Sequence, residues 1–195
     1  MSDFSRNFIK ESMEALTKID VAEVDKVAAA LAERRERGGR LFILGNGGSA
    51  GHASHAVNDF RKLCAFEAYA PTDNVSELTA RANDEGWDTT FSAWLGVSRI
   101  NKNDAVMVFS VGGGSRERQV SMNLVKALEA AKAAGALITG IVGRDGGYTR
   151  EVSEACVVIP NVANDRVTPH QEGLCAVVWH LLVSHPALKV NATKW

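Results

Sequence analysis

The sequence has few cysteines, few prolines, no excess of either charge and no long apolar run. Its 195 residues include three cysteines and four prolines, and 23 acidic residues balance 22 basic ones. Cys64, Cys156 and Cys175 are odd in number and far apart, which predicts core thiols in a reducing compartment, and neither a disulfide framework nor a zinc knuckle. The balanced charge provides no overall field for nucleic acid or an anionic membrane, so any anion site must be local.

The sequence also has no stretch that resembles a targeting signal or a membrane helix. The N-terminal stretch MSDFSRNFIKESME is polar and charged, unlike a secretory signal peptide. No apolar run approaches the roughly 18 residues of a membrane helix. We therefore expect a cytoplasmic protein with neither a nucleic-acid nor a membrane partner, and one domain over residues 1–195, because no stretch has the composition of a linker.

Short aliphatic runs alternate with helical patterns along the chain. Apolar residues at helical spacing predict two leading helices, at about 3–18 and 21–37, and a later one at 115–135. Continuous apolar runs, typical of strands buried on both faces, lie at 40–44, 104–110, 136–142 and 155–160. This rhythm predicts an α/β fold with a parallel sheet and right-handed crossovers.

Two glycine-rich loops follow predicted strands. GNGGSA covers residues 45–50 and SVGGGS covers residues 110–115. Ligands of parallel sheets bind beyond the carboxyl ends of the strands, where bare amides and helix N-termini attract phosphate. One such loop alone is equally well explained as a tight turn, but two at equivalent points favour an anion cradle. Neither is a Walker loop, and only the G/A variant of GxGxxG fits, so a nucleotide is not favoured.

A polar helix face is predicted directly after the first loop. His55 and Asp59 are four residues apart, so both rise from one face, as a shared metal or substrate requires. His52 either leans toward the same site or faces outward. The alternative for the pair is an ordinary solvated contact between neighbouring turns.

The stretch GNGGSAGHASHAVNDF resembles the signature of the phosphoheptose isomerases of the sugar isomerase (SIS) domain superfamily. The resemblance extends to about His185 and includes LTARANDEGW, SVGGGS, GIVGRDGG and TPHQEGLCAVVWH. It implies a three-layer α-β-α sandwich with a five-stranded parallel flavodoxin-like sheet, preceded by two N-terminal helices. It further implies a homotetramer with active sites at subunit interfaces, in which residues 1–38 serve oligomerisation, 39–185 form the core and 186–195 form a tail.

The same resemblance implies an activity and a set of site residues. The activity is aldose-ketose isomerisation of sedoheptulose 7-phosphate to D-glycero-D-manno-heptose 7-phosphate by enediolate proton transfer, for lipopolysaccharide or capsule sugars. Asp59 and His180 are the expected acid and base, and zinc, one ion per subunit, is expected on His55, Asp59, Glu172 and His180. The sugar phosphate is expected to contact Asn46, Gly47, Gly48, Ser49, Asn83, Asp84, Ser110, Gly112, Gly113, Gly114, Ser115 and Glu172.

The metal positions depart from the family pattern. Asp59 stands where the family usually has glutamate, which is one methylene longer. The family has a glutamine on the last helix, eight residues before a histidine, but Gln171 is nine residues before His180 and falls on the opposite helix face. Glu172 has the spacing of eight, so we prefer it, and His170 is the other candidate on this helix.

The phosphate loop departs from the family pattern as well. Val111 and Gly112 replace two hydroxyl residues, so some phosphate contacts must pass to amides or to a basic side chain. The basic candidates are Arg116, Arg118 and Arg61, although an arginine at each position is more often a solvated surface residue.

Four alternatives to this assignment stay open. Asp84 fits a turn cap as well as a sugar contact, and His180 fits a hydrogen-bonded core histidine beside Trp179. The SIS fold also serves non-catalytic sugar-phosphate sensors and protein-binding scaffolds, and another isomerase substrate such as a hexose phosphate is conceivable. Retention of both site histidines favours the enzyme, because a scaffold has no evident use for them.

Overall fold

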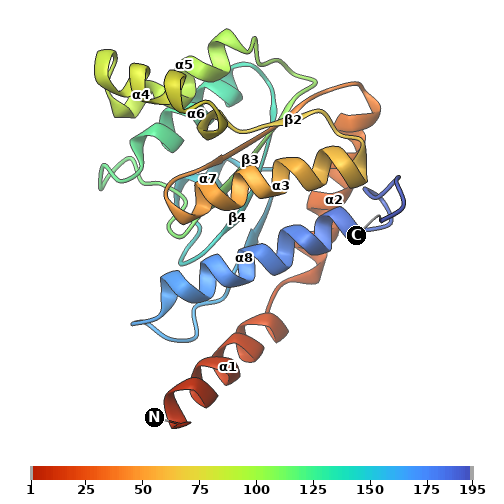
Figure 1. The fold of residues 1–195 in the computed structure, drawn as a ribbon, viewed down its shortest axis with the longest axis vertical. Helices are drawn as coiled ribbons and strands as arrows, with labels where there is room; N and C mark the ends of the chain where they lie inside the picture. Colours follow the sequence, from red (N-terminus) through yellow and green to blue (C-terminus); the bar gives the residue numbers. More distant parts are fainter. Residues whose placement is uncertain (1, 194–195) are drawn as a thin grey trace.

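Five parallel strands form the centre of the fold (Figure 1). The computed structural model describes residues 2–193. The strands, in the sheet order β2-β1-β3-β4-β5, are β1 Leu41–Gly45, β2 Ala68–Tyr69, β3 Ala105–Ser110, β4 Leu137–Val142 and β5 Ala155–Val158. All four pairings are parallel. The chain leaves β1 in one direction and returns to its other side with β3, which creates the topological switch point where open α/β sheets bind ligands.

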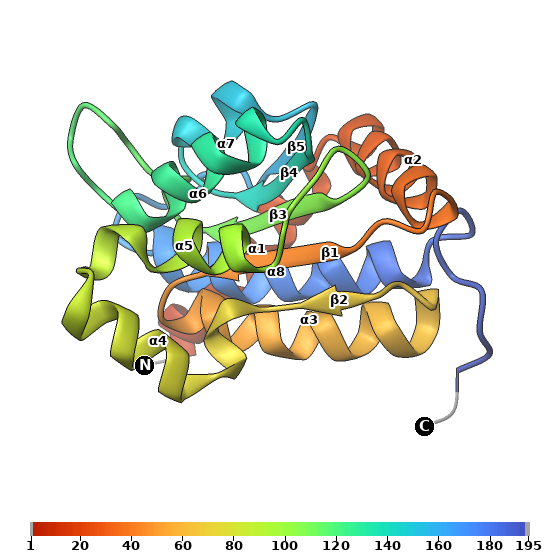
Figure 2. The same cartoon turned by 90° about the horizontal axis from the view of Figure 1, so that it is seen from above.

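Helices cover both faces of this sheet, which gives three layers (Figure 2). Helices α2, α3 and α8 pack on one face, and α5, α6 and α7 on the other. The helices are α1 Ser2–Thr17, α2 Val21–Glu36, α3 Gly48–Cys64, α4 Val75–Asp84, α5 Thr90–Val97, α6 Met122–Ala133, α7 Gly147–Val152 and α8 Val167–Ser184, with 3-10 turns at Pro71–Asp73 and Trp87–Thr89. No helix among residues 2–193 is long and apolar enough to cross a membrane.

The strands are apolar on both sides because both sides are covered. In β1, Leu41 and Ile43 enter the core under α3 and α8, while Phe42 and Leu44 enter the core under α5 and α6. Every residue of β1, β3 and β4 is buried. The predicted fold class, with its five-stranded parallel sheet and two leading helices, is therefore confirmed.

Two predictions about elements need correction. The helix predicted from residue 115 begins only at Met122, because Ser115 and Val120 exchange backbone hydrogen bonds of 3.0 and 3.1 Å and close a turn. Gln119 and Ser121 have positive φ, which a continuous helix does not allow. The second strand, β2, was not visible as an apolar run because it has only two residues and lies at the sheet edge.

The first helix is attached to the last one by a charged cluster. Glu11 on α1 accepts hydrogen bonds of 2.9 Å from Arg166 and contacts His170 Nε2 at 2.8 Å, and Ser12 contacts the other ring nitrogen at 3.2 Å. These bonds, with Arg166 first, lower the pKa of Glu11 to about 2. His170, the other candidate ligand on this helix, therefore anchors α1 and takes no part in the site.

We expect this attachment to weaken in acid. A carboxylate with a depressed pKa stabilises the fold fully above its ordinary value of 4.5, and that contribution is lost as the pH falls toward about 2. Melting temperatures of wild type and Glu11→Gln, measured from pH 7 to pH 2.5, should therefore differ at neutral pH and converge below pH 4.5. A difference that stays constant over this range would contradict the assignment.

The C-terminal tail folds back onto the end of α3. Leu188 is fully buried, and the amides of Val190 and Asn191 donate to the carbonyl of Leu63 at 3.0 and 2.9 Å. Arg35 donates to the carbonyl of Leu188. Trp195, the last residue of the predicted tail, lies outside the described residues.

Candidate active site

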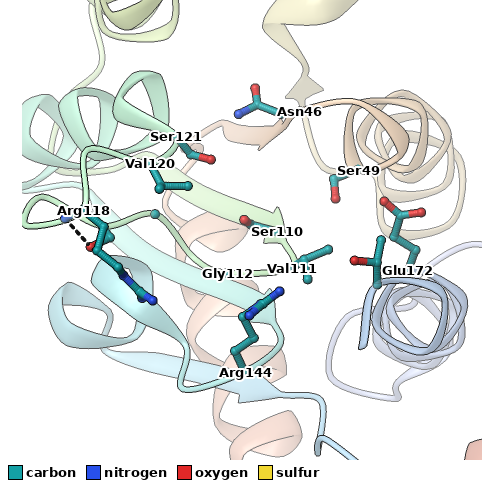
Figure 3. A pocket seen from close by; sticks show the side chains of 13 residues that line it. Asn46, Ser49, Ser110, Val111, Gly112, Arg118, Val120, Ser121, Arg144 and Glu172 are labelled. Carbon is teal, nitrogen blue, oxygen red and sulfur yellow. Dashed lines mark hydrogen bonds between the residues drawn. The ribbon is translucent and has the colours of Figure 1, made fainter. Parts of the chain in front are cut away.

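A cavity of about 460 Å³ lies at the carboxyl edge of the sheet, at the switch point (Figure 3). It is formed by the loops that follow β1, β3 and β4 and by the first turns of α8. Its lining residues are Asn46, Ser49, Ser110, Val111, Gly112, Gly114, Ser115, Arg118, Val120, Ser121, Arg144, Thr168 and Glu172. Both predicted glycine-rich loops thus contribute to one cavity.

The first loop brings the N-terminus of α3 to the cavity wall. Gly47 precedes the helix with a φ of 58°, a conformation that glycine adopts without strain. A Cβ at Gly48 would lie 2.8 Å from the carboxylate of Glu172, so a larger residue there would require this flexible side chain to move. That carboxylate therefore sits against the positive end of the α3 dipole, which stabilises its negative charge.

The second loop presents hydroxyl groups that remain free to donate. Ser110 Oγ accepts the amide proton of Gly113 at 3.0 Å, and Ser115 Oγ accepts that of Arg118 at 3.2 Å. Because each hydroxyl uses a lone pair for the backbone, its own proton is available to a ligand oxygen. The wall is therefore built to donate hydrogen bonds to an anion.

An amide pair attaches the first loop to helix α6. Asn46 and the buried Asn123 exchange side-chain hydrogen bonds of 3.1 and 2.8 Å. This reciprocal pair fixes the loop after β1 to the start of α6, so the cavity wall is largely preformed.

Two imidazoles and a carboxylate converge farther along α3 and α8, outside the lining of this cavity. His55 Nε2 and His180 Nε2 each lie 3.7 Å from Asp59 Oδ2. The ligand atoms of the three residues lie within 4.8 Å of one another, which makes them a possible metal-binding group. The side chain of Asp59 is only 4% exposed, whereas those of His55 and His180 are 59% and 48% exposed.

The ring of Trp179 packs against both imidazoles. Its buried ring stacks on His180 at 3.5 Å between centroids and meets His55 edge-on at 4.7 Å. His180 Nδ1 lies 2.7 Å from the carbonyl of Ala176. A carbonyl oxygen only accepts, so Nδ1 donates this hydrogen bond and Nε2 is the ring nitrogen that faces Asp59.

Other residues expected at the metal lie elsewhere. Glu172 is not in the group of three, because its carboxylate packs against Gly48 at the cavity end of α8. Gln171 is buried in the core, where it donates to the carbonyl of Ile141 at 3.4 Å. His52 is half-buried and stays outside the group.

Several residues expected at the sugar do not reach the cavity. Asn83 and Asp84 end α4 as exposed residues that bond to each other, and they do not line it. Gly47, Gly48 and Gly113 shape the loops behind the wall and do not line it themselves.

Of the three arginines predicted as phosphate ligands, one lines the cavity and two do not. Arg118 lines the cavity, but Arg116 binds Glu129 and Tyr148, and Arg61 binds the carbonyl of Ala68. Arg144 and Thr168 line the cavity although the sequence did not predict either at the site. The signal for Arg144 was its place in GIVGRDGG, directly after a predicted strand.

The cysteines do not offer a nucleophile. All three are buried free thiols. Burial raises the pKa of Cys64 to about 12 and that of Cys156 to about 11, and it also raises the pKa of Cys175 on α8. A reactive thiolate is therefore disfavoured at each position.

Comparison with known proteins places this geometry in context. Residues 6–143 match the family model described as the SIS domain. A phosphoheptose isomerase of Akkermansia muciniphila is 33% identical, over 86% of this chain and 88% of its own length. The lincomycin biosynthesis protein LmbN of Streptomyces lincolnensis is 31% identical, over 92% of this chain and 68% of its own length. The solved phosphoheptose isomerase of Neisseria gonorrhoeae superposes with a TM-score of 0.80 at 25% identity, covering 94% of this chain and 97% of that one.

Proposed function

Because the chain belongs to the phosphoheptose isomerase family of SIS-domain proteins, we propose that it converts sedoheptulose 7-phosphate to D-glycero-D-manno-heptose 7-phosphate. The protein is thus a sugar-phosphate aldose-ketose isomerase. The observation that carries the proposal is the meeting of a buried carboxylate with two imidazoles on α3 and α8, the two helices whose first turns reach the cavity.

Acid and base are assigned to the two groups that face each other across α3 and α8. The reaction removes a proton from C1 of the ketose and returns one to C2, through an enediolate. Asp59 Oδ2 and His180 Nε2 are 3.7 Å apart, so one group can take a proton while the other donates one. The burial of Asp59 keeps competing water from its carboxylate.

The separation of the cavity from Asp59 and His180 suits a long sugar phosphate. Glu172 at the cavity and His180 at the proposed chemistry are eight residues apart on α8, or about 12 Å along the helix axis. A substrate that spans this distance carries its reacting carbons far from its phosphate. Sedoheptulose 7-phosphate has this character, since C1 and C2 react and C7 carries the phosphate.

We further propose zinc as the metal of the His55, Asp59 and His180 group. Two imidazoles and one carboxylate are a donor set that zinc favours, and their ligand atoms already lie within 4.8 Å of one another. Catalytic zinc sites use three protein ligands and keep a further position open. When bound there, zinc polarises the carbonyl and hydroxyl oxygens of the sugar.

A homotetramer with active sites at subunit interfaces is proposed from two exposed surfaces. His55 and His180 are about half exposed beside Val177 and Leu181, which are also exposed, so the site needs a cover to exclude water. Helix α1 extends away from the sheet (Figure 1) and exposes Phe4, Ile9 and Met13. Copies of the chain that pack on both surfaces would bury these apolar residues and close the site. The free thiols support a reducing location, which we propose to be the cytoplasm.

The activity is tested by incubating metal-loaded and chelated protein with sedoheptulose 7-phosphate and following the aldose product. We expect turnover by the zinc-loaded protein and at least a tenfold lower rate after chelation, because the oxygens of the enediolate then lose their Lewis acid. Absence of turnover in both samples, together with tight sugar-phosphate binding, would contradict the isomerase assignment and indicate a non-catalytic sugar-phosphate sensor. Fructose 6-phosphate as a parallel substrate separates heptose from hexose specificity.

A further inference from the structure

Arg144 occupies a strained backbone position at the cavity. It follows β4 with a φ of 54°, where residues other than glycine are uncommon. The loop is fixed on either side, because Gly143 donates to the carbonyl of Ser110 at 3.2 Å and Thr149 donates to that of Gly113 at 2.9 Å. Strain of this kind persists where the surroundings impose it, and it is concentrated at functional sites.

The loop that carries Arg144 is packed directly onto the phosphate loop. A Cβ at Gly113 would lie 1.9 Å from the carbonyl oxygen of Gly146, and one at Gly147 would lie 2.2 Å from that of Gly112. The two backbones are therefore in direct contact. This contact places the stem of Arg144 beside Gly112, whose Cβ would meet only Arg144 Cδ, at 3.9 Å.

The guanidinium of Arg144 points into the cavity (Figure 3) and, within residues 2–193, has no hydrogen bond or ion pair. The other basic lining residue, Arg118, already places Nε at 3.5 Å from Ser115 Oγ. Glu172, the acidic lining residue, lies on a different side of the cavity, on α8 (Figure 3). The wall beside Arg144 consists of Val111 and Gly112, which offer no side-chain donor.

We propose that Arg144 binds the phosphate of the sugar substrate and provides the charged donor that Val111 and Gly112 lack. The proposal rests on the isomerase function and deepens it. A guanidinium presents paired N–H groups that match phosphate oxygens, and such charge-assisted bonds are about twice as strong as neutral ones. The phosphate site then includes a third loop, after β4, beside those after β1 and β3.

The test compares Arg144→Gln and Arg144→Lys with a matched control. Arg99 is also an arginine with positive φ, at 52°, but it is exposed and remote from the cavity, so Arg99→Gln removes the same charge from the same kind of backbone. Loss of a charged hydrogen bond weakens binding by roughly 10- to 150-fold. We therefore expect Arg144→Gln to raise KM for sedoheptulose 7-phosphate by about that factor with a smaller change in kcat, Arg144→Lys to recover part of it, and Arg99→Gln to leave both unchanged.

A second readout is independent of turnover. Calorimetric titration with inorganic phosphate should show the same loss of affinity in Arg144→Gln, and circular dichroism should show native folding of both variants. Wild-type KM and phosphate affinity in folded Arg144→Gln would overturn the proposal. If wild type binds phosphate but does not isomerise the sugar, loss of phosphate binding in Arg144→Gln still supports the role of Arg144, and only the isomerase assignment fails.

Discussion

Asp59→Asn should abolish isomerisation while leaving the fold intact. The substitution keeps the shape of a side chain that is only 4% exposed, but it removes the carboxylate that both imidazoles face at 3.7 Å. Loss of a positioned acid or base typically costs 10²- to 10⁴-fold, and loss of a zinc ligand adds to that. We therefore expect kcat to fall by at least about 10³-fold in a coupled assay for the aldose product.

A matched histidine-carboxylate pair elsewhere provides the control. His185 Nε2 lies 3.2 Å from Asp25 Oδ1 at the surface, outside the site, so Asp25→Asn removes the same kind of contact with no catalytic role. That variant should retain wild-type kcat. Zinc titration by calorimetry supplies a readout besides activity, and Asp59→Asn should bind zinc more weakly whereas Asp25→Asn should not. Near-normal turnover by folded Asp59→Asn would remove the carboxylate from the chemistry.

Asp59→Glu examines the shorter side chain at the same position. Glutamate adds one methylene, and Asp59 Oδ2 already lies at the same 3.7 Å from both imidazoles. The longer side chain must displace one of these contacts or fold back, so we expect reduced kcat with largely retained zinc affinity. His180→Ala, in contrast, should lose both turnover and zinc affinity while sugar-phosphate binding stays largely unchanged.

Strand positions were readable from the sequence because burial on both faces leaves a simple signature. The apolar runs at 40–44, 104–110, 136–142 and 155–160 each overlap an observed strand, and their ends differ from those of the strand by at most two residues. The prediction of a helix before Met122 was wrong because the apolar spacing there is helical. In the structure the amides of Ser115 and Val120 donate to each other's carbonyls, which forms a turn in place of helical hydrogen bonds. Such competition between a turn and a helix is decided by backbone hydrogen bonds, which composition does not reveal.

Site residues on one helix were predictable, and those brought together by loop packing were not. The spacing of His55 and Asp59 determines their common face, and the family spacing on the last helix selected His180. Arg144 depends on the contact between the loops after β3 and β4, which no periodicity encodes. Glu172 shows the same limit, since its spacing from His180 suited a shared metal but its carboxylate is held at the N-terminus of α3.

Asp104→Ala should produce the largest loss of stability that the structure predicts. Asp104 is 1% exposed and lies just before β3, where its carboxylate accepts two side-chain hydrogen bonds from Arg40, at 3.1 and 2.8 Å, and one from that residue's amide at 2.9 Å. Asn101 donates two more, both at 3.0 Å. These bonds raise the pKa of Arg40, with the side-chain bond to Asp104 as the main cause.

Removal of Asp104 leaves its backbone donors without an acceptor and leaves the guanidinium of Arg40, which is 24% exposed, without its partner; together these cost about 3 kcal/mol, the lower end of the range for a buried pair. For a chain of this size that loss lowers the melting temperature by roughly 6–12 °C, measurable by calorimetry together with urea unfolding. Asp88→Ala removes an exposed carboxylate 3.8 Å from Lys126 and should cost less than about 1 kcal/mol. Asp104 lies at the amino edge of the sheet and the cavity at the carboxyl edge, so kcat of folded Asp104→Ala at low temperature should stay near wild type. A large fall in kcat under those conditions would mean that the two edges of the sheet are coupled through β1 and β3. The positions of Ser49 and Ser110 would then depend on the register of these strands as well as on local hydrogen bonds.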